Sequence, residues 1–200
     1  MGRDVDDASR TPRMPQGSIQ AVLYSIVWIG QAAAWLILPI LALVLVGVTL
    51  SALKIGTIVD WDRDVFLFGS KLTLASLGDL QWHLFGAMLM LTMAGALITN
   101  NHVRVDFLRQ HMSLTVKRWI DLLGHILFLM PLVAVVVMHG YDFTIRSYTM
   151  GEGSNYDGLY DRFVLKATIP IGFALLGLAG LGLFFLRLRE LLRRDPSEFE

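Results

Sequence analysis

The sequence predicts an all-α membrane protein with four transmembrane helices and both termini in the cytoplasm. Hydrophobic residues make up 54% of the 200 residues and charged residues only 17%, and the mean hydropathy is +0.57. A soluble domain carries about 25% charged residues. The hydrophobic residues also occur in long runs, each reaching the roughly 20 residues that a helix needs to cross about 30 Å of hydrocarbon.

These runs define the domain organisation. We expect a polar tail over residues 1–18, a membrane domain over residues 19–186 and a second polar tail over residues 187–200. The spans are predicted at residues 32–53, 80–99, 119–141 and 164–186. Lipid offers the backbone no hydrogen-bond partners, so each span is expected to be a helix.

The first hydrophobic run is too long for one perpendicular span. It extends from Ile19 to Leu53, about 52 Å of helix at 1.5 Å per residue. In Ile19–Gly30, apolar residues at helical spacing alternate with polar ones, so we expect an interfacial or strongly tilted helix before the first span. Pro39 is expected to kink the span that follows.

The connection to the second span is expected to return to the membrane surface. Asp60–Asp64 is an acidic, solvated stretch, and apolar residues resume over Val65–Leu77. We therefore predict a surface-lying amphipathic segment between the first two spans. Ser76 and Asp79 precede the second span in a pattern typical of a helix N-cap.

Basic residues predict the orientation of the chain. Eleven lie in the two tails and the second connection, and six lie in the first and third connections. The first set is Arg3, Arg10, Arg13, Arg104, Arg109, Lys117, Arg118, Arg187, Arg189, Arg193 and Arg194, and the second is Lys54, Arg63, Lys71, Arg146, Arg162 and Lys166. The positive-inside rule then places both termini in the cytoplasm.

Charge balance and composition exclude several classes of protein. The 17 basic and 17 acidic residues cancel, so no net field recruits nucleic acid. The chain has no cysteine, which excludes disulfides, thiolate metal sites, iron–sulfur clusters and cysteine nucleophiles. Phosphate-binding glycine loops, metalloprotease helices and G-x-S-x-G elbows are also absent from the sequence, so we expect neither enzyme activity nor a cofactor.

No acidic or basic residue is expected near the middle of the membrane. Asp79 lies before the second span, Asp121 can pair with Lys117 or Arg118 at one end of the third, and Lys166 can extend outward from the fourth. A pump that couples transport to ions or protons by itself normally needs an ionisable group inside the membrane. The pattern therefore predicts that any transport chemistry happens in another chain.

The histidines leave a haem protein open as an alternative. His125 and His139 are fourteen residues apart, which places them within about 40° on one helix face. His83 and His139 could also hold a single haem, as in a membrane cytochrome or quinone-linked subunit. The other interpretation is that they are hydrogen-bonding residues near the membrane surface. A free-standing four-span transporter is a further alternative.

Five short stretches follow one another in an order that is typical of one family. They are Leu80–Gly86, Asn101–Leu108, Trp119–Gly124, Gly151–Ser154 and Lys166–Phe173. Over Gly78–Leu183 the chain thereby resembles the small membrane subunit of tripartite ATP-independent periplasmic (TRAP) transporters.

The resemblance implies a non-catalytic permease subunit in the bacterial inner membrane. In this family a periplasmic binding protein captures a carboxylate substrate, and a large multi-span subunit holds the substrate and sodium sites. The small subunit packs on the large one and enlarges its static part. The expected partners are therefore the large subunit, the binding protein through the complex, and the phospholipid bilayer, in the uptake of an organic acid.

The same motifs supply candidate structural or partner-contact residues. These are Asp79, Gln81, Trp82, His83, His102, Arg104, Asp106, Glu152, Lys166, Pro170 and Gly172. The fourth span adds Gly177 and Gly180, small residues that permit either packing within this chain or contact with a neighbouring subunit. No catalytic, substrate-binding or metal-binding residue is predicted.

Overall fold

The structure, a computed structural model, describes residues 17–99, 112–154, 156 and 158–192. It contains four helical stretches that are long and apolar enough to cross a membrane. They are Ser18–Ala52, Leu74–Ile98, Trp119–Thr149 and Phe163–Arg189. The prediction of a mostly helical chain with four apolar helices long enough to span a membrane is therefore confirmed, with boundaries that differ from the expected ones.

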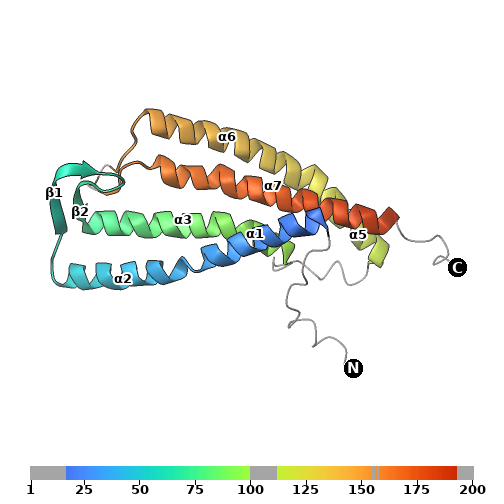
Figure 1. Cartoon of the computed structure of the whole chain (residues 1–200), viewed down its shortest axis with the longest axis horizontal. Helices are drawn as coiled ribbons and strands as arrows, with labels where there is room; N and C mark the ends of the chain where they lie inside the picture. The colour runs from blue at the N-terminus through green and yellow to red at the C-terminus, as the bar shows by residue number, and fades with distance from the viewer. Residues whose placement is uncertain (1–16, 100–111, 155, 157, 193–200) are drawn as a thin grey trace, which may run out of the picture.

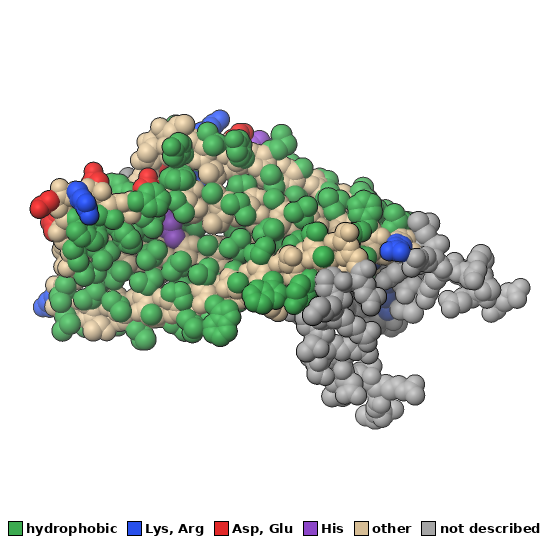
Figure 2. Space-filling view, in the orientation of Figure 1, with side chains coloured by type: hydrophobic (Ala, Val, Ile, Leu, Met, Phe, Trp, Pro, Cys, Tyr) green, Lys and Arg blue, Asp and Glu red, His purple; other side chains and the backbone are tan. Residues whose placement is uncertain are grey.

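The helices lie side by side in an open row (Figure 1). α6 (Met130–Thr149) packs on α7 (Phe163–Leu192), and α7 packs on α3 (Leu74–Ile98). On its other side, α3 contacts α1 (Ser18–Ala34) and α2 (Ile37–Ala52). Among the described elements, α2 has an extensive contact with α3 alone. The row leaves many helix sides uncovered by the chain itself, and hydrophobic side chains dominate the face shown in Figure 2.

The buried core lies where three helices of the row meet. Leu23 and Ile26 of α1 pack with Ala94 of α3 and with Leu176 and Ala179 of α7. Both alanines are fully buried, so they allow the helix backbones to approach closely, as small residues do in membrane helix pairs.

Pro39 divides the first hydrophobic run into α1 and α2. Proline has no N–H to donate to the carbonyl of Trp35, four residues earlier, and that carbonyl accepts from Leu38 instead at 3.1 Å. The kink expected in the span that contains Pro39 is present as a break at Trp35 and Leu36. The helix before it does not end at Gly30, as expected for a separate entry helix, but continues to Ala34. α1 is a member of the row through its contacts with α3 and α7.

A β-hairpin replaces the amphipathic segment predicted between the first two spans. β1 (Thr57–Val65) pairs antiparallel with β2 (Gly69–Thr73), and the register shifts within β1. Leu67 and Gly69 adopt positive φ angles of 72° and 64° in the turn. β-branched residues at the start of β1 favour an extended chain, so this prediction was wrong about the local structure.

The helix N-cap predicted at Ser76 and Asp79 is also wrong. α3 begins at Leu74, and Thr73 caps it by accepting a hydrogen bond from the Ser76 N–H at 3.2 Å. The Ser76 hydroxyl in turn accepts from the Thr73 N–H, which completes a reciprocal capping box. Asp79 is therefore an internal helix residue, and its carboxylate is available for contacts across the row.

The third span changes its winding partway along its length. α5 (Leu114–Gly124) continues through a π-helical turn, η1 (His125–Leu129), into α6. The wider turn moves the helix register by roughly one residue, about 100°. The prediction that His125 and His139 share one helix face is therefore wrong.

The row has two distinct ends (Figure 1). The hairpin and the connection between α6 and α7 lie at one end, which we call the hairpin end. The first residues of α1 and the last residues of α7 lie at the other, which we call the opposite end. Because the chain runs along the row an even number of times, the first and the last helix have their outer ends on the same side.

Candidate functional site

Polar side chains converge at the hairpin end, where Asp79 of α3 faces the connection before α7. Its Oδ2 oxygen accepts hydrogen bonds from the backbone N–H of Leu159 at 3.2 Å and from Arg162 Nη2 at 3.3 Å. Gly158 passes so close to this carboxylate that a Cβ at that position would overlap it. Asp79 therefore ties α3 to the connection through one charged pair and one backbone contact.

A second ion pair joins the same connection to α7. Lys166 contacts the carboxylate of Glu152, and its Nζ lies 3.8 Å from the centre of the Phe143 ring of α6. The Lys166 ammonium is the main cause that lowers the pKa of Glu152 below its ordinary value. The lysine side chain is only 13% exposed, so the pair and the ring together compensate for burying its charge.

His83 completes what we call the hairpin-end cluster (Asp79, His83, Glu152, Arg162 and Lys166). Its Nδ1–H donates to the backbone carbonyl of Asp79 at 2.6 Å, and Nε2 is buried without a hydrogen-bond partner among the described residues. A cavity of about 340 Å³ lies between these five side chains, Trp82 and Leu165. Two acids and two bases pair across it, so the cavity offers no net charge for an anion or a cation.

The hairpin is fastened to the same connection. Tyr160 donates its N–H to the carbonyl of Leu67 at 2.8 Å, and the Leu67 N–H donates to Asp161 Oδ2 at 3.3 Å. The Tyr160 ring covers Gly69, where any Cβ would overlap it. The cluster and the hairpin are thus joined through the connection before α7, and their contacts hold the ends of α3 and α7 together with the hairpin.

The structure brings only some of the predicted candidates together. Asp79, His83, Glu152 and Lys166 share the hairpin-end cluster, and Trp82 borders it with 71% of its surface exposed. Gln81 points to another side of α3, toward α2. The candidates His102, Arg104 and Asp106 lie outside the described residues.

The candidates on α7 pack against neighbouring helices of this chain. A Cβ on Gly172 would lie 2.5 Å from the carbonyl oxygen of Met90 in α3. Gly177 lies against Val133, and Gly180 lies against Leu129 and Met130. Pro170 lies beside Gly140 of α6. Of the two roles expected for Gly177 and Gly180, these contacts match packing within the chain.

His83 and His139 are not placed to hold a haem between their two helices. His83 is on α3 and His139 is on α6, and α7 packs between these two helices (Figure 1). Within the described part of the chain, no three His, Asp or Glu side chains form a group that could hold a metal ion.

Two charged residues were missed by the sequence analysis. Arg162 was counted only as a connection residue, because its partner Asp79 is 83 positions away and no local spacing reveals the pair. Asp142 lies on an exposed side of α6, which continues to Thr149 beyond the expected end of the third span. Asp121, expected to pair within its own helix, lies 3.5 Å from Arg187 of α7.

Comparison with known families gives one match. The family described as "Tripartite ATP-independent periplasmic transporters, DctQ component" matches residues 63–190. The match therefore includes the end of β1, all of β2, the hairpin-end cluster and the last three spans. No curated protein and no solved structure matches the chain.

Proposed function

Because the chain belongs to the DctQ family, the small membrane component of TRAP transporters, we propose that it is a non-catalytic scaffold for the larger membrane component. In this role it packs on the larger component and extends the part that stays fixed in the bilayer. The sites for substrate and sodium then belong to the partner.

One observation carries the proposal: the spans contain long stretches without an acidic or basic residue. Residues 18–52, 80–98, 122–141 and 167–186 contain no Asp, Glu, Lys or Arg. Ion-coupled transport through this chain alone would need such groups facing a cavity inside the membrane. The paired charges of the hairpin-end cluster lie at the ends of helices and engage one another, which suits a rigid support.

The shape of the row supports the same role. Among the described elements, α2 packs extensively only on α3, and α6 packs extensively only on α7 outside its own span, so broad apolar sides remain free for lipid or for a second membrane protein. We propose that the hairpin end faces the periplasm and the opposite end faces the cytoplasm, as the positive-inside rule predicts from the eleven basic residues in the sequence of the two tails and the second connection. The first residues of α1 then lie at the cytoplasmic headgroup level, as an interfacial segment would.

The partners and the substrate class follow from the family. We propose that the chain works in a bacterial inner membrane with the larger membrane component and, through it, with a periplasmic binding protein. The substrate is proposed to be an organic acid, captured by the binding protein.

Deletion and purification test the scaffold role together. Cells that lack this chain should lose uptake through the transporter, and the chain should purify with the larger component in mild detergent. Normal uptake without the chain would contradict the proposal. Uptake into liposomes that contain only this chain would favour the alternative of a free-standing transporter.

A further inference from the structure

The least covered helix of the row is α2. Ile40 is its one buried residue, although α2 is the most apolar helix described. Its extensive contact is with α3 alone, whereas α1 also reaches α7. α1 and α2 follow one another beside α3 (Figure 1), and a groove lies between α3 and these two helices.

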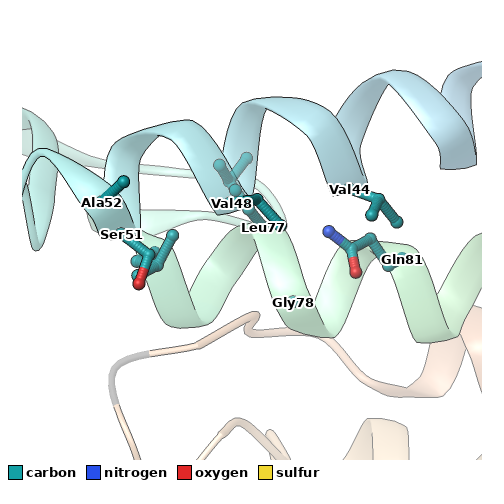
Figure 3. Close-up of a pocket in the computed structure, with 9 residues that line it drawn as sticks. Val44, Val48, Ser51, Ala52, Leu77, Gly78 and Gln81 are labelled. Atoms are coloured by element: carbon teal, nitrogen blue, oxygen red, sulfur yellow. The ribbon is translucent and has the colours of Figure 1, made fainter.

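Two hollows lie along this groove. At the hairpin end, a hollow of about 530 Å³ is lined from α2 by small residues such as Gly47 and Ser51, and from α3 by Gly78 and Gln81 (Figure 3). Near the opposite end, a hollow of about 240 Å³ lies between α1 and α3.

Both hollows open on the same side of α3. The first is lined by its residues 74, 77, 78 and 81, and the second by residues 92, 95, 96 and 99. Each member of the second set lies 18 positions after its counterpart, which is five turns at 3.6 residues per turn. The two hollows therefore lie on one face of α3, and the groove follows this face over almost the full length of the helix.

Each hollow contains a side-chain amide that has no hydrogen-bond partner among the described residues. Gln81 extends from α3 toward α2 (Figure 3), and its Nε2 lies 3.5 Å from where a Cβ on Gly47 would stand. Gln31 is an exposed residue of α1 and lines the second hollow. Both lie in uncharged, membrane-spanning segments, where an amide left without a partner is costly.

Lipid chains and a protein helix differ in what they offer these amides. Acyl chains fill a groove but provide no donor or acceptor, whereas a helix can supply side-chain or carbonyl groups across the contact. The small residues that line the groove also let a second backbone approach closely, which is how membrane helices associate. The two amides therefore favour a protein occupant.

We propose that the groove between α1–α2 and α3 receives a transmembrane helix of the larger membrane component, with Gln31 and Gln81 hydrogen-bonded to it. This inference rests on the proposed function and specifies which side of the chain meets the partner. The rest of the row, including the exposed side of α6, then faces lipid.

Paired substitutions test the groove in the full complex. Gly78→Leu and Gly124→Leu both add a side chain where a Cβ has no neighbour within 4 Å, so neither substitution places its Cβ against another part of the chain. Gly78 lines the groove and Gly124 does not. Gln81→Leu keeps the size of the side chain and removes the amide.

The measured quantity is the apparent dissociation constant for the larger component in mild detergent. Gly78→Leu and Gln81→Leu should each raise this constant, Gln81→Leu by about threefold to tenfold, and Gly124→Leu should leave it unchanged. Unchanged association in both groove variants would overturn the inference while leaving the proposed function intact. Failure of the unaltered chain to associate would overturn both.

Photo-crosslinking distinguishes protein from lipid in the groove. A photoreactive residue placed at Ala52 or Ala96, one in each hollow, should give an adduct with the larger component. The same residue at Ala134, on an exposed part of α6, should give lipid adducts only. Lipid adducts alone from both hollows of an intact complex would show that the groove is filled by lipid and would overturn the inference.

Discussion

The contact between α3 and α7 holds the centre of the row, and a single methyl group at Gly172 should disturb it. A Cβ there would lie 2.5 Å from the Met90 carbonyl oxygen, 2.8 Å from Met90 Cβ and 2.9 Å from the Met90 carbonyl carbon. Ordinary contacts of a Cβ begin at 3.4 Å. The two helices must therefore separate by about 1 Å at this point, because two of the three blocking atoms belong to the backbone.

The expected cost follows from two opposing effects. Overpacking of a close contact costs about 1–3 kcal/mol, and rigid backbone atoms favour the upper part of that range. Replacing glycine by alanine within a helix returns up to about 1 kcal/mol through helix propensity. We therefore expect Gly172→Ala to lower the free energy of unfolding by about 1–2 kcal/mol.

Gly124→Ala provides the matched control. This glycine is also helical, but a Cβ on it has no neighbour within 4 Å, so only the propensity gain of up to about 1 kcal/mol applies. Both variants of the full chain can be unfolded by denaturant titration in detergent micelles and followed by circular dichroism. Equal or stabilising effects of the two substitutions would refute the close approach of α3 and α7.

Three further predictions concern the hairpin-end cluster and the kink. Asp79→Asn should destabilise the chain by about 1–2 kcal/mol, because Arg162 loses its charged partner. The same substitution should speed hydrogen exchange at the Leu159 amide, and unchanged exchange would contradict the hydrogen bond between this amide and Asp79. Because the pKa of Glu152 is lowered, its ion pair stabilises the connection before α7 above pH 4.5, and this contribution is lost as the pH falls through the lowered pKa. The rate at which a protease cuts that connection should therefore rise in acid for the native chain. The Glu152→Gln variant should be cut at equal rates at neutral and acidic pH. Pro39→Ala should restore the missing N–H and straighten the helix pair α1–α2. The distance between spin labels at the start of α1 and the end of α2 should then increase, and an unchanged distance would show that the kink has another cause.

The four spans could be predicted because their signal is local. Each is a run of apolar residues whose length alone meets the requirement of the bilayer, so their number and order were correct. The kink was also predictable, since Pro39 removes a specific backbone hydrogen bond. Its exact place depends on which carbonyl finds another donor, and the sequence does not specify that.

The hairpin and the ionic contacts could not be predicted from local sequence patterns. The β-branched start of β1 was a usable signal, but the acidic residues that follow it resemble a solvated loop. Asp79 and Arg162 meet only because α3 and α7 are neighbours in the row. The π-helical turn at His125–Leu129 left no recognised pattern, and it changed the face on which His125 lies.

Sodium uptake by reconstituted liposomes tests most directly whether this chain is a support rather than a transporter. Three preparations are compared under the same gradient: this chain alone, the larger component with its binding protein, and the complete assembly with substrate. We expect substrate-dependent uptake of radioactive sodium in the complete assembly and none above empty liposomes for the chain alone. Sodium uptake by the chain alone would contradict the scaffold role, because it would require an ion site within the long stretches of the spans that carry no charged residue.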